Sequence, residues 1–317
     1  MSTTSSKVLV LFGPTAVGKT ASIERLGHDD RLPRKPVVVI SADSVQIYRG
    51  LNIGSAKPSE LERSRIRHEL IDILDPTEPF SVGDFVRLAD EACERATAEG
   101  ALPVLSGGTA YYIKAFLYGQ PPAPPSDPQI RAAIQAELAE RGSAVLRTEL
   151  ALVDPESAAR IAPADLYRIT RALEVYRCSG RPLSSFVPLA EPRPRWDTLV
   201  VGLDRPRAEL YARIDARVDA MLAAGLADEV QALRAAGYGP GDPGMRAIGY
   251  AEFLAAAPRR NDSLPLEAIA AEIKMHTRRY AKRQLTFMRS LSDVRWFGAN
   301  DYESIFAEAT GWLLKSP

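Results

Sequence analysis

Cysteine is scarce in this chain, and so is any excess of charge of one sign. The two cysteines, Cys93 and Cys178, lie far apart with no CxxC or Cys/His spacing, which argues against a disulfide scaffold or a structural zinc site. We expect both to be small apolar core residues. The 40 basic and 40 acidic residues cancel, so a nucleic-acid surface would have to come from local asymmetry of charge.

Long apolar runs are also missing. No run approaches the roughly 18 residues that cross a bilayer, and the polar residues 1–6 followed by a short apolar stretch do not fit a signal peptide. We therefore expect a cytoplasmic protein without a membrane partner. The sequence has no heptad pattern and no long apolar surface helix, so we expect a monomer.

A glycine-rich stretch near the start is the strongest motif that is present. It fits G-x-x-x-x-G-K-[ST], follows the apolar run Val8–Phe12 and precedes a segment that can be helical, which is the context that supports a phosphate loop. Its candidate phosphate-binding residues are Gly13, Pro14, Thr15, Ala16, Val17, Gly18, Lys19 and Thr20. The glycines let backbone N–H groups point at phosphate oxygens, Lys19 adds a charge, and the Thr20 hydroxyl is a candidate Mg²⁺ ligand.

An acidic residue follows the next predicted strand. Residues 37–40 are apolar and β-branched, which is typical of a parallel strand covered on both faces, and Asp43 comes directly after them. Ligands bind at the carboxyl edge of an open α/β sheet, so Asp43 is expected to face the same crevice as the phosphate loop. The alternative is that Asp43 only caps the next helix.

A second glycine turn repeats this design further along the chain. Residues 70–74 are predicted to form a third strand, residues 81–100 a helix, and residues 102–105 a fourth strand that ends in the sequence SGGT at 106–109. Two such turns at one sheet edge could enclose a ligand between them. A simple tight turn between strand and helix is the alternative for the second one.

Proline-rich breaks predict the domain organisation. The run at 121–125 and the segment 182–194 flank a helical, alanine- and charge-rich block. Strand character returns over residues 196–204, and we take the sheet to resume near Leu199. We therefore predict an α/β fold with a parallel-sheet core like that of the P-loop NTPases, helices on both of its faces, and an inserted all-helical domain. The core would comprise residues 1–120 and 199–317, and the insert residues 121–198.

Basic residues gather on two later helices. In the predicted helix 207–224, Arg213 and Arg217 share one face, although interleaved aspartates leave a solvated, salt-bridged face as an alternative. Residues 273–289 carry six basic residues and no acid. Their predicted stripe is Lys274, Arg278 and Lys282, with Tyr280 and Phe287 as the buried stripe. An all-basic stripe in a neutral protein favours a surface for a phosphate backbone over an ordinary solvated face.

Together these motifs resemble those of the tRNA dimethylallyltransferases, which prenylate the adenosine immediately 3′ of the anticodon. The matching stretches cover most of the chain and are GPTAVGKT, SADSVQIYRGLNIGSAKP, SGGTAYY, LYRITRALEVYRCSG, MRAIGY and KRQLTFMR. Val17 stands where a serine is common, and Asn52 and Ser55 stand where aspartate and threonine are common. None of these differences removes a group that the chemistry needs.

The resemblance implies a reaction. The phosphate loop would hold the diphosphate of dimethylallyl diphosphate, with Mg²⁺ on Thr20, while adenine N6 attacks the allylic carbon. Asp43 would serve as the general base. Thr109 would orient the adenine or the prenyl donor, and Lys19 and Arg217 would hold the diphosphate. The division of roles between Arg213 and Arg217 is left open by the sequence.

The resemblance also implies a tRNA surface, because the target adenine must leave its stack to react. The implied tRNA contacts are Asp43, Ser44, Val45, Gln46, Thr109, Arg131, Tyr167, Arg168, Arg171, Arg246, Gly249, Tyr250, Lys282, Arg283, Gln284 and Arg289.

Three other functions share part of this pattern. A kinase of the nucleotide or shikimate type shares the loop and the acid but leaves the basic C-terminal helix unexplained. An isopentenyltransferase acting on free AMP or ATP needs neither the insert nor that helix. A nucleotide-switched RNA-binding protein keeps the loop and the basic stripe, with Asp43 as a Mg²⁺ partner.

Overall fold

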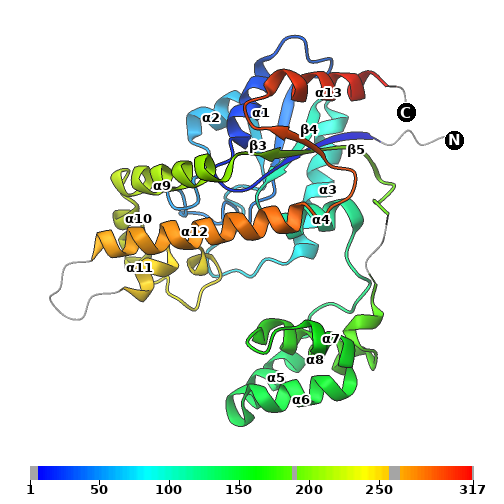
Figure 1. Ribbon diagram of the computed structural model, residues 1–317, viewed down its shortest axis with the longest axis vertical. Helices are drawn as coiled ribbons and strands as arrows, with labels where there is room; N and C mark the ends of the chain where they lie inside the picture. Colours follow the sequence, from blue (N-terminus) through cyan, green and yellow to red (C-terminus); the bar gives the residue numbers. More distant parts are fainter. Residues whose placement is uncertain (1–5, 188–190, 257–264, 316–317) are drawn as a thin grey trace. The chain divides into compact units, whose positions relative to one another are not determined.

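The contacts of the chain divide it into two compact units (Figure 1). The computed structural model describes residues 6–187, 191–256 and 265–315. The core unit comprises Met1–Leu117 and Arg193–Pro317, and the insert unit comprises Tyr118–Pro192. The predicted strand over Trp196–Asp204 is confirmed as the strand that re-enters the sheet, and the Trp196 side chain is buried. The predicted domain boundary at residue 199 differs from the structure, because the core unit already resumes at Arg193.

The core unit contains one six-stranded sheet in which all strand pairs are parallel. Its strands, in the spatial order β3-β2-β4-β1-β5-β6, are β1 Ser6–Phe12, β2 Val37–Ser41, β3 Arg67–Glu69, β4 Leu102–Gly107, β5 Trp196–Asp204 and β6 Arg295–Gly298. Because the strands run the same way, the turns that follow β1, β2 and β4 meet at one edge. That edge is where ligands bind in sheets of this kind.

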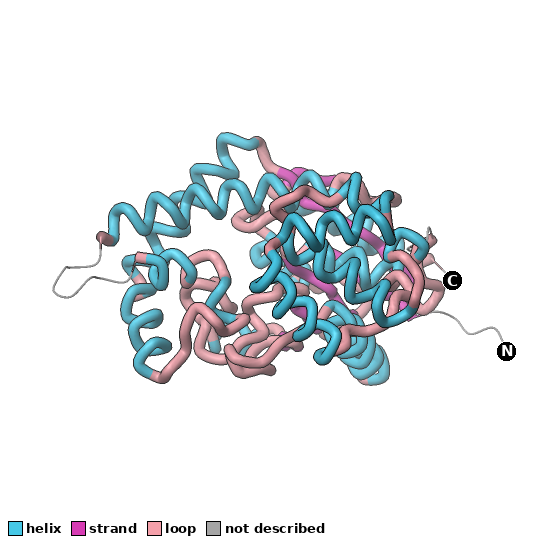
Figure 2. Tube along the Cα trace, turned by 90° about the horizontal axis from the view of Figure 1, so that it is seen from below, coloured by secondary structure: helices cyan, strands magenta, loops and turns pink. Residues whose placement is uncertain are grey.

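Helices cover both faces of the sheet, as Figure 2 shows. They are α1 Lys19–His28, α2 Glu60–Arg65, α3 Val82–Ala98, α4 Ala110–Tyr118, α9 Arg207–Ala223, α10 Leu226–Ala235, α11 Ala251–Ala255, α12 Leu266–Met288 and α13 Tyr302–Leu314, with a short 3₁₀ turn at Gly244–Arg246. Leu9 and Leu11 of β1 share a core cluster with residues of α1, α9 and α13, whereas Val38 of β2 packs with Ala96 of α3. The predicted α/β class with a parallel sheet between helices is confirmed.

The third strand lies elsewhere than predicted. Residues 70–72 form a bend, Leu74 makes only an isolated parallel bridge with Tyr48, and β3 occupies the three residues before this segment. Leu70 and Asp72 have φ angles of 62° and 57°, a left-handed backbone that no regular strand contains. Asp72 is held there by Lys57 at 2.5 Å and Arg63 at 2.9 Å. The apolar run was therefore misleading, because two ion pairs from outside the segment set its backbone.

One polar cluster fastens the place where the chain leaves the core and returns to it. Arg193 donates from its backbone N–H to the Leu117 carbonyl and from Nε to the Phe116 carbonyl, and both distances are 2.7 Å. Its guanidinium bonds to both carboxylate oxygens of Asp90 at 2.8 and 2.9 Å. Asp90 also accepts from Trp196 Nε1 at 2.8 Å. Because these groups are largely buried and mutually satisfied, they join the two ends of the insertion within the core.

The insert unit is all-helical and has its own core. Its helices are α5 Pro128–Arg141, α6 Ser143–Val153, α7 Pro155–Arg160 and α8 Leu166–Ser179, followed by a 3₁₀ turn at Leu183–Ser185. Ile134, Leu146 and Leu173 are buried together between them. Arg177 joins α8 to Glu137 and Glu149 on the two neighbouring helices.

Cysteine and long apolar runs are the features that are scarce in the sequence. Cys93 is buried, as predicted, but Cys178 is only half-buried. In the described ranges, every helix is too short or too polar to cross a membrane.

Candidate active site

The phosphate loop is a tight turn between β1 and α1. Ala16 and Gly18 have φ angles of 63° and 121°, of which the second strongly favours glycine. A Cβ atom on Gly13 would lie 2.9 Å from the Leu203 carbonyl oxygen, so the loop can pack against β5 only with glycine there. The turn leads directly into the first N–H groups of α1, which have no intrahelical acceptor and can bind an anion.

Three cationic side chains hold the carbonyl groups of this loop. Lys19 Nζ donates to the carbonyls of Gly13 and Pro14 at 2.9 and 3.0 Å. Arg213 Nε donates to the Ala16 carbonyl at 2.8 Å, and Arg205 Nε donates to the Val17 carbonyl at 3.1 Å. Because these cations bind carbonyl oxygens of the loop, the loop can present N–H groups and positive charge to a ligand.

The charged form of Lys19 is destabilised when no anion is bound. Burial, and to a smaller extent the nearby Arg217, lower the pKa of Lys19 to about 8, while Asp43 opposes the shift. Burial also lowers the pKa of Arg217. Two desolvated cations that face each other are stabilised when a polyvalent anion binds between them.

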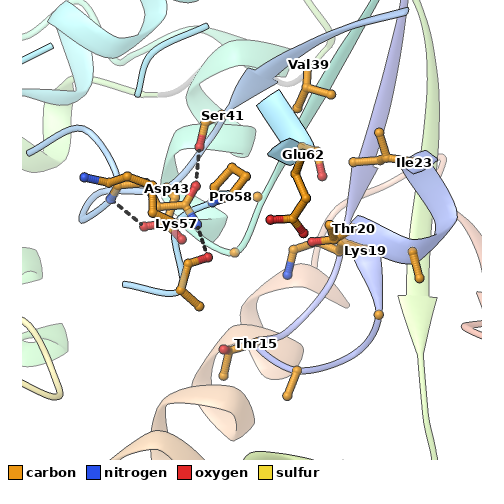
Figure 3. A pocket seen from close by; sticks show the side chains of 18 of the residues that line it. Thr15, Lys19, Thr20, Ile23, Val39, Ser41, Asp43, Lys57, Pro58 and Glu62 are labelled. Carbon is orange, nitrogen blue, oxygen red and sulfur yellow. Dashed lines mark hydrogen bonds between the residues drawn. The ribbon is translucent and has the colours of Figure 1, made fainter. Parts of the chain in front are cut away.

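A cavity of about 640 Å³ lies at the carboxyl edge of the sheet. Its walls include Lys19 and Thr20 of the phosphate loop, Asp43 after β2, and Gly107 and Gly108 after β4. Figure 3 shows Lys19 and Asp43 on facing sides of it. The predicted meeting of both glycine turns and Asp43 at one crevice is therefore confirmed.

Asp43 has two roles in the local geometry. Its Oδ1 atom accepts hydrogen bonds from the N–H groups of Val45 and Gln46 at 2.9 and 3.3 Å. This cap closes a turn and not a helix, so the alternative of simple helix capping is not what the structure contains. The cap fixes the carboxylate while Asp43 still lines the cavity, which is what a positioned base requires.

Thr109 holds the turn that carries Asp43. Its Oγ1 accepts from the N–H of Ser44 at 3.1 Å and donates to the Ser44 hydroxyl at 3.3 Å, and its own N–H donates to the Ala42 carbonyl at 3.1 Å. A Cβ atom on Gly107 would lie only 2.1 Å from that same carbonyl oxygen. The second glycine turn is thus more than a connection, because its close approach locks the β2 and β4 turns together.

A second, smaller cavity of about 290 Å³ adjoins the first. The two share Thr15, Asp43, Arg217 and Tyr280. The remaining walls are largely apolar and include Val45, Ile214, Val218, Met221, Ile248 and Ile273. Asp43 therefore stands at the junction of a cationic cavity and an apolar one.

The salt-bridge partners on α9 and α12 differ from those predicted. Asp215 pairs with Arg278 at 2.8 Å and Asp219 pairs with Lys274 at 2.5 Å. The α9 aspartates are thus bound to α12 and not to the arginines of their own helix, and Arg213 and Arg217 line the larger cavity. The predicted basic stripe on α12 is correspondingly wrong for its first two members, whose charges are paired.

Gln284 of α12 connects the two glycine turns. Its Oε1 accepts from the Thr15 N–H at 3.0 Å, and its Nε2 donates to the Gly108 carbonyl at 2.6 Å. Only 4% of the residue is exposed, which does not favour the direct tRNA contact expected from the sequence. The predicted buried stripe is also wrong in detail, because Tyr280 and Phe287 are half-buried and Tyr280 lines both cavities. The helical period alone could not locate this bridge.

Other predicted tRNA contacts differ in accessibility within the core unit. Tyr250 is fully buried and donates its hydroxyl to Glu229 at 2.7 Å, so it supports the fold. The side-chain amide of Gln46 bonds to Ser41 and to the Ala56 carbonyl. Arg246 and Gly249, by contrast, line the smaller cavity with Ser44 and Val45.

Within the insert unit, the predicted contacts fall into two pairs. Arg131 and Arg171 are bound to the buried carboxylate of Glu174 at 3.4 and 3.0 Å, so they stabilise the helices. Tyr167 is 71% exposed and Arg168 beside it is also exposed. The second pair is available for binding.

The three basic residues near the end of α12 are exposed, but they lie on different sides of the helix. Lys282 and Arg289 line a third cavity of about 610 Å³ beside Arg207, and Arg289 pairs with Asp204 at 2.7 Å. The Arg283 guanidinium lies 5.9 Å from the centre of the Tyr280 ring, on the side of the catalytic cavities.

The donor atoms near Thr20 fit Mg²⁺ in one specific way. The described residues contain no cluster of three acidic, histidine or cysteine side chains that could hold a metal. Mg²⁺ commonly uses one or two protein ligands and takes the rest from substrate phosphates and water. The Thr20 hydroxyl, which lines the cavity next to Lys19, suits that arrangement.

Comparisons with known proteins agree with one another. The family model described as IPP transferase matches residues 46–291. A tRNA dimethylallyltransferase of Geobacillus kaustophilus (strain HTA426) is 43% identical over 302 residues, which cover 94% of this chain and 92% of the relative. One of Anaeromyxobacter dehalogenans (strain 2CP-C) is 42% identical over 294 residues, covering 92% and 94%.

Solved structures are similar over nearly the whole chain. The tRNA isopentenylpyrophosphate transferase of Bacillus halodurans superposes with a TM-score of 0.67 at 35% identity, covering 97% of this chain and 95% of that one. A eukaryotic dimethylallyltransferase crystallised while acting on tRNA gives a TM-score of 0.77 at 27% identity, covering 97% and 77%.

Proposed function

This chain belongs to the IPP transferase family, and from that premise we propose that it transfers a dimethylallyl group from dimethylallyl diphosphate to a tRNA adenosine. The acceptor atom is N6 of the adenosine immediately 3′ of the anticodon, and diphosphate is released. One observation carries the proposal: the phosphate loop, Arg217 and Asp43 line a single cavity that continues into an apolar one at Asp43. A leaving group, a base and an apolar space are the three requirements of this transfer.

The donor binds through its diphosphate. The N–H groups at the start of α1, the Lys19 ammonium and the Arg217 guanidinium surround the phosphate oxygens. As the bond between the allylic carbon and the diphosphate oxygen breaks, its electron pair stays on that oxygen. Fixed positive groups stabilise this developing charge without having to reorganise, which lowers the barrier.

Mg²⁺ is the proposed cofactor, held by the Thr20 hydroxyl together with phosphate oxygens and water. When bound, it would neutralise charge on the departing diphosphate.

The acceptor meets the donor at the junction of the two cavities. N6 of the adenine forms the new bond to the allylic carbon and loses one proton, which Asp43 accepts. The Oδ1 atom of Asp43 already accepts two backbone N–H groups, so the other carboxylate oxygen is the one to take the proton. Thr109 acts by holding Ser44, and therefore Asp43, in place.

The tRNA is bound by exposed groups outside the two catalytic cavities. Lys282 and Arg283 of α12 and Arg289 directly after it are exposed, and Tyr167 and Arg168 are exposed on the insert unit. Cationic side chains of this kind contact the phosphate backbone and position the loop. Because the acceptor is tRNA, we also propose a cytoplasmic location, and we propose a monomer.

One experiment tests the proposal against its alternatives. The protein is incubated with Mg²⁺ and dimethylallyl diphosphate labelled in the hydrocarbon, with either tRNA or AMP as acceptor. We expect the label on tRNA, at the adenosine 3′ of the anticodon. Label on AMP alone would indicate a free-nucleotide enzyme, and phosphate transfer from ATP without any C5 transfer would indicate a kinase.

A further inference from the structure

Two adjacent tyrosines open helix α4, directly after Thr109, and only one of them belongs to the core. Tyr112 is buried and stacks on Phe85 with ring centres 4.3 Å apart. Tyr111 points to another side of the helix and is 48% exposed. Single exposed apolar residues are common on protein surfaces, so the neighbours of Tyr111 decide whether it can bind a ligand.

Helix α12 fixes the ring of Tyr111. Phe287 meets it edge to face, with ring centres 6.5 Å apart and planes at 79°. The ammonium group of Lys114 lies 5.7 Å from the centre of the Phe287 ring. The edge contact favours one orientation of the Tyr111 ring, which lowers the entropy cost of binding a flat ligand to it, and Lys114 places a cation at the Phe287 side of this pair.

Contacts along α12 link Phe287, and through it Tyr111, to residues that line the catalytic cavities. Tyr280 lines both cavities, Arg283 lies over its ring, and Phe287 follows on α12 one turn later. Tyr111 stands two residues after Thr109, which holds the Asp43 turn. A ligand that enters at Asp43 and continues along the surface can thus reach Tyr111.

We propose that Tyr111, supported by Phe287, is a stacking platform for the nucleobase next to the target adenosine. The inference rests on the proposed function, because it needs an RNA loop whose target base has been extruded. Extrusion deprives a neighbouring base of a stacking partner, and an aromatic side chain can replace that partner. Lys114 and Arg283 supply positive charge for the adjoining phosphates.

The test combines protein variants with altered RNA. Anticodon stem-loops are made intact, or with the base removed from the nucleotide 5′ or 3′ of the target adenosine. Binding of each RNA to the protein is measured by fluorescence anisotropy in the absence of dimethylallyl diphosphate. We expect Tyr111→Ala to bind intact RNA about ten-fold more weakly or worse, and Tyr111→Phe to bind like the wild type. On the abasic RNA that lacks the stacked base, the wild type and Tyr111→Ala should bind equally.

Two results would overturn the platform. One is unchanged binding of intact RNA by Tyr111→Ala. The other is an equal loss on the intact RNA and on both abasic RNAs, which would indicate a general surface effect. Leu314→Ala is the matched control, because Leu314 is an exposed apolar residue on α13 and should bind every RNA like the wild type.

The variants also separate this inference from the proposed function. If the wild type prenylates tRNA and Tyr111→Ala binds normally, only the platform fails. If the wild type transfers no C5 group to tRNA, the proposed function fails, whereas the anisotropy still reports on the platform. Phe287→Leu keeps an apolar side chain but removes the edge contact, so it should show a smaller loss that also vanishes on the abasic RNA.

Discussion

Gln284 accepts a hydrogen bond from the backbone N–H of Thr15 at 3.0 Å, although the two residues are 269 positions apart in the sequence. The same amide donates to Gly108, so one buried side chain of α12 sets the distance between the phosphate loop and the second glycine turn. The helix proposed to bind RNA and the loop proposed to bind the donor are therefore mechanically connected.

Replacing that bridge should weaken both stability and catalysis. Gln284→Leu leaves the N–H of Thr15 and the Gly108 carbonyl without their partner, which costs about 1–3 kcal/mol of the free energy of unfolding. We expect a lower midpoint of urea unfolding and a higher KM for the donor. An unchanged KM for the donor would show that the loop holds its shape without α12.

Asp43→Asn should separate the base from the cap. The asparagine Oδ1 can still accept from Val45 and Gln46, while the amide can no longer take the N6 proton. We expect kcat to fall by about 10²–10⁴-fold with unchanged donor affinity and unchanged unfolding. Asp43→Ala should show the same loss of kcat plus about 1 kcal/mol of destabilisation from the lost cap. Wild-type turnover by Asp43→Asn would remove this carboxylate from the reaction.

Donor binding should weaken at alkaline pH because of Lys19. Its pKa in the free protein is about 8, so the ammonium is charged below that pH and becomes neutral above it. The anionic donor binds the charged form, so its affinity should be flat below pH 8 and should fall about ten-fold per pH unit above it. In Lys19→Arg, whose side chain stays charged, the alkaline fall measured by calorimetry should disappear. A wild-type affinity that is constant to pH 9.5 would contradict this assignment.

Arg213 and Arg217 should fail in different ways. Arg217 is the half-buried cation that interacts with Asp43 and Lys19, so Arg217→Ala should lower kcat/KM by roughly 10²-fold. Arg213 holds the carbonyl of Ala16, whose φ is 63°, so Arg213→Ala should act through the loop. Ala16→Gly removes the steric cost of that backbone and should restore part of the activity of Arg213→Ala but none of the activity of Arg217→Ala. If Ala16→Gly restored the activity of both variants equally, the two arginines would not differ in role.

Salt titration should separate the basic residues of α12. Arg283→Ala and Lys282→Ala each remove an exposed cation. In each variant, log K for tRNA binding should fall less steeply with log salt concentration, with a slope smaller in magnitude by about 0.7 if one phosphate contact is lost. Lys274→Ala is the matched control, because its charge is bound to Asp219. We expect that variant to keep the wild-type slope, and equal slopes for all four proteins would exclude α12 as the phosphate surface.

The sequence predicted local features far better than contacts between distant segments. Glycine patterns, a strand and a following helix define the loop at 13–20 within a few residues, and a parallel sheet then brings Asp43 to the same edge. The partners of Asp215 and Asp219 depend on how α9 lies against α12, which no local pattern encodes. Gln284 was assigned to RNA for the same reason, since only the packed helix shows that its amide is buried.

The missed third strand shows how tertiary contacts override a local pattern. The apolar run at 70–74 is typical of a strand, but Lys57 and Arg63 pair with Asp72 and favour a left-handed backbone there. Neither cation lies within the pattern that predicted the strand. Two ion pairs therefore decide the conformation of this short segment.

The cluster around Arg193 has an architectural consequence. Because Phe116 and Leu117 are bonded directly to Arg193, the core closes on itself whatever lies between them. In topological terms the helical unit is a side branch that starts and finishes at one junction, so its length and helix count are decoupled from the register of the sheet. A chain built in this way can change the branch while the catalytic edge keeps its geometry.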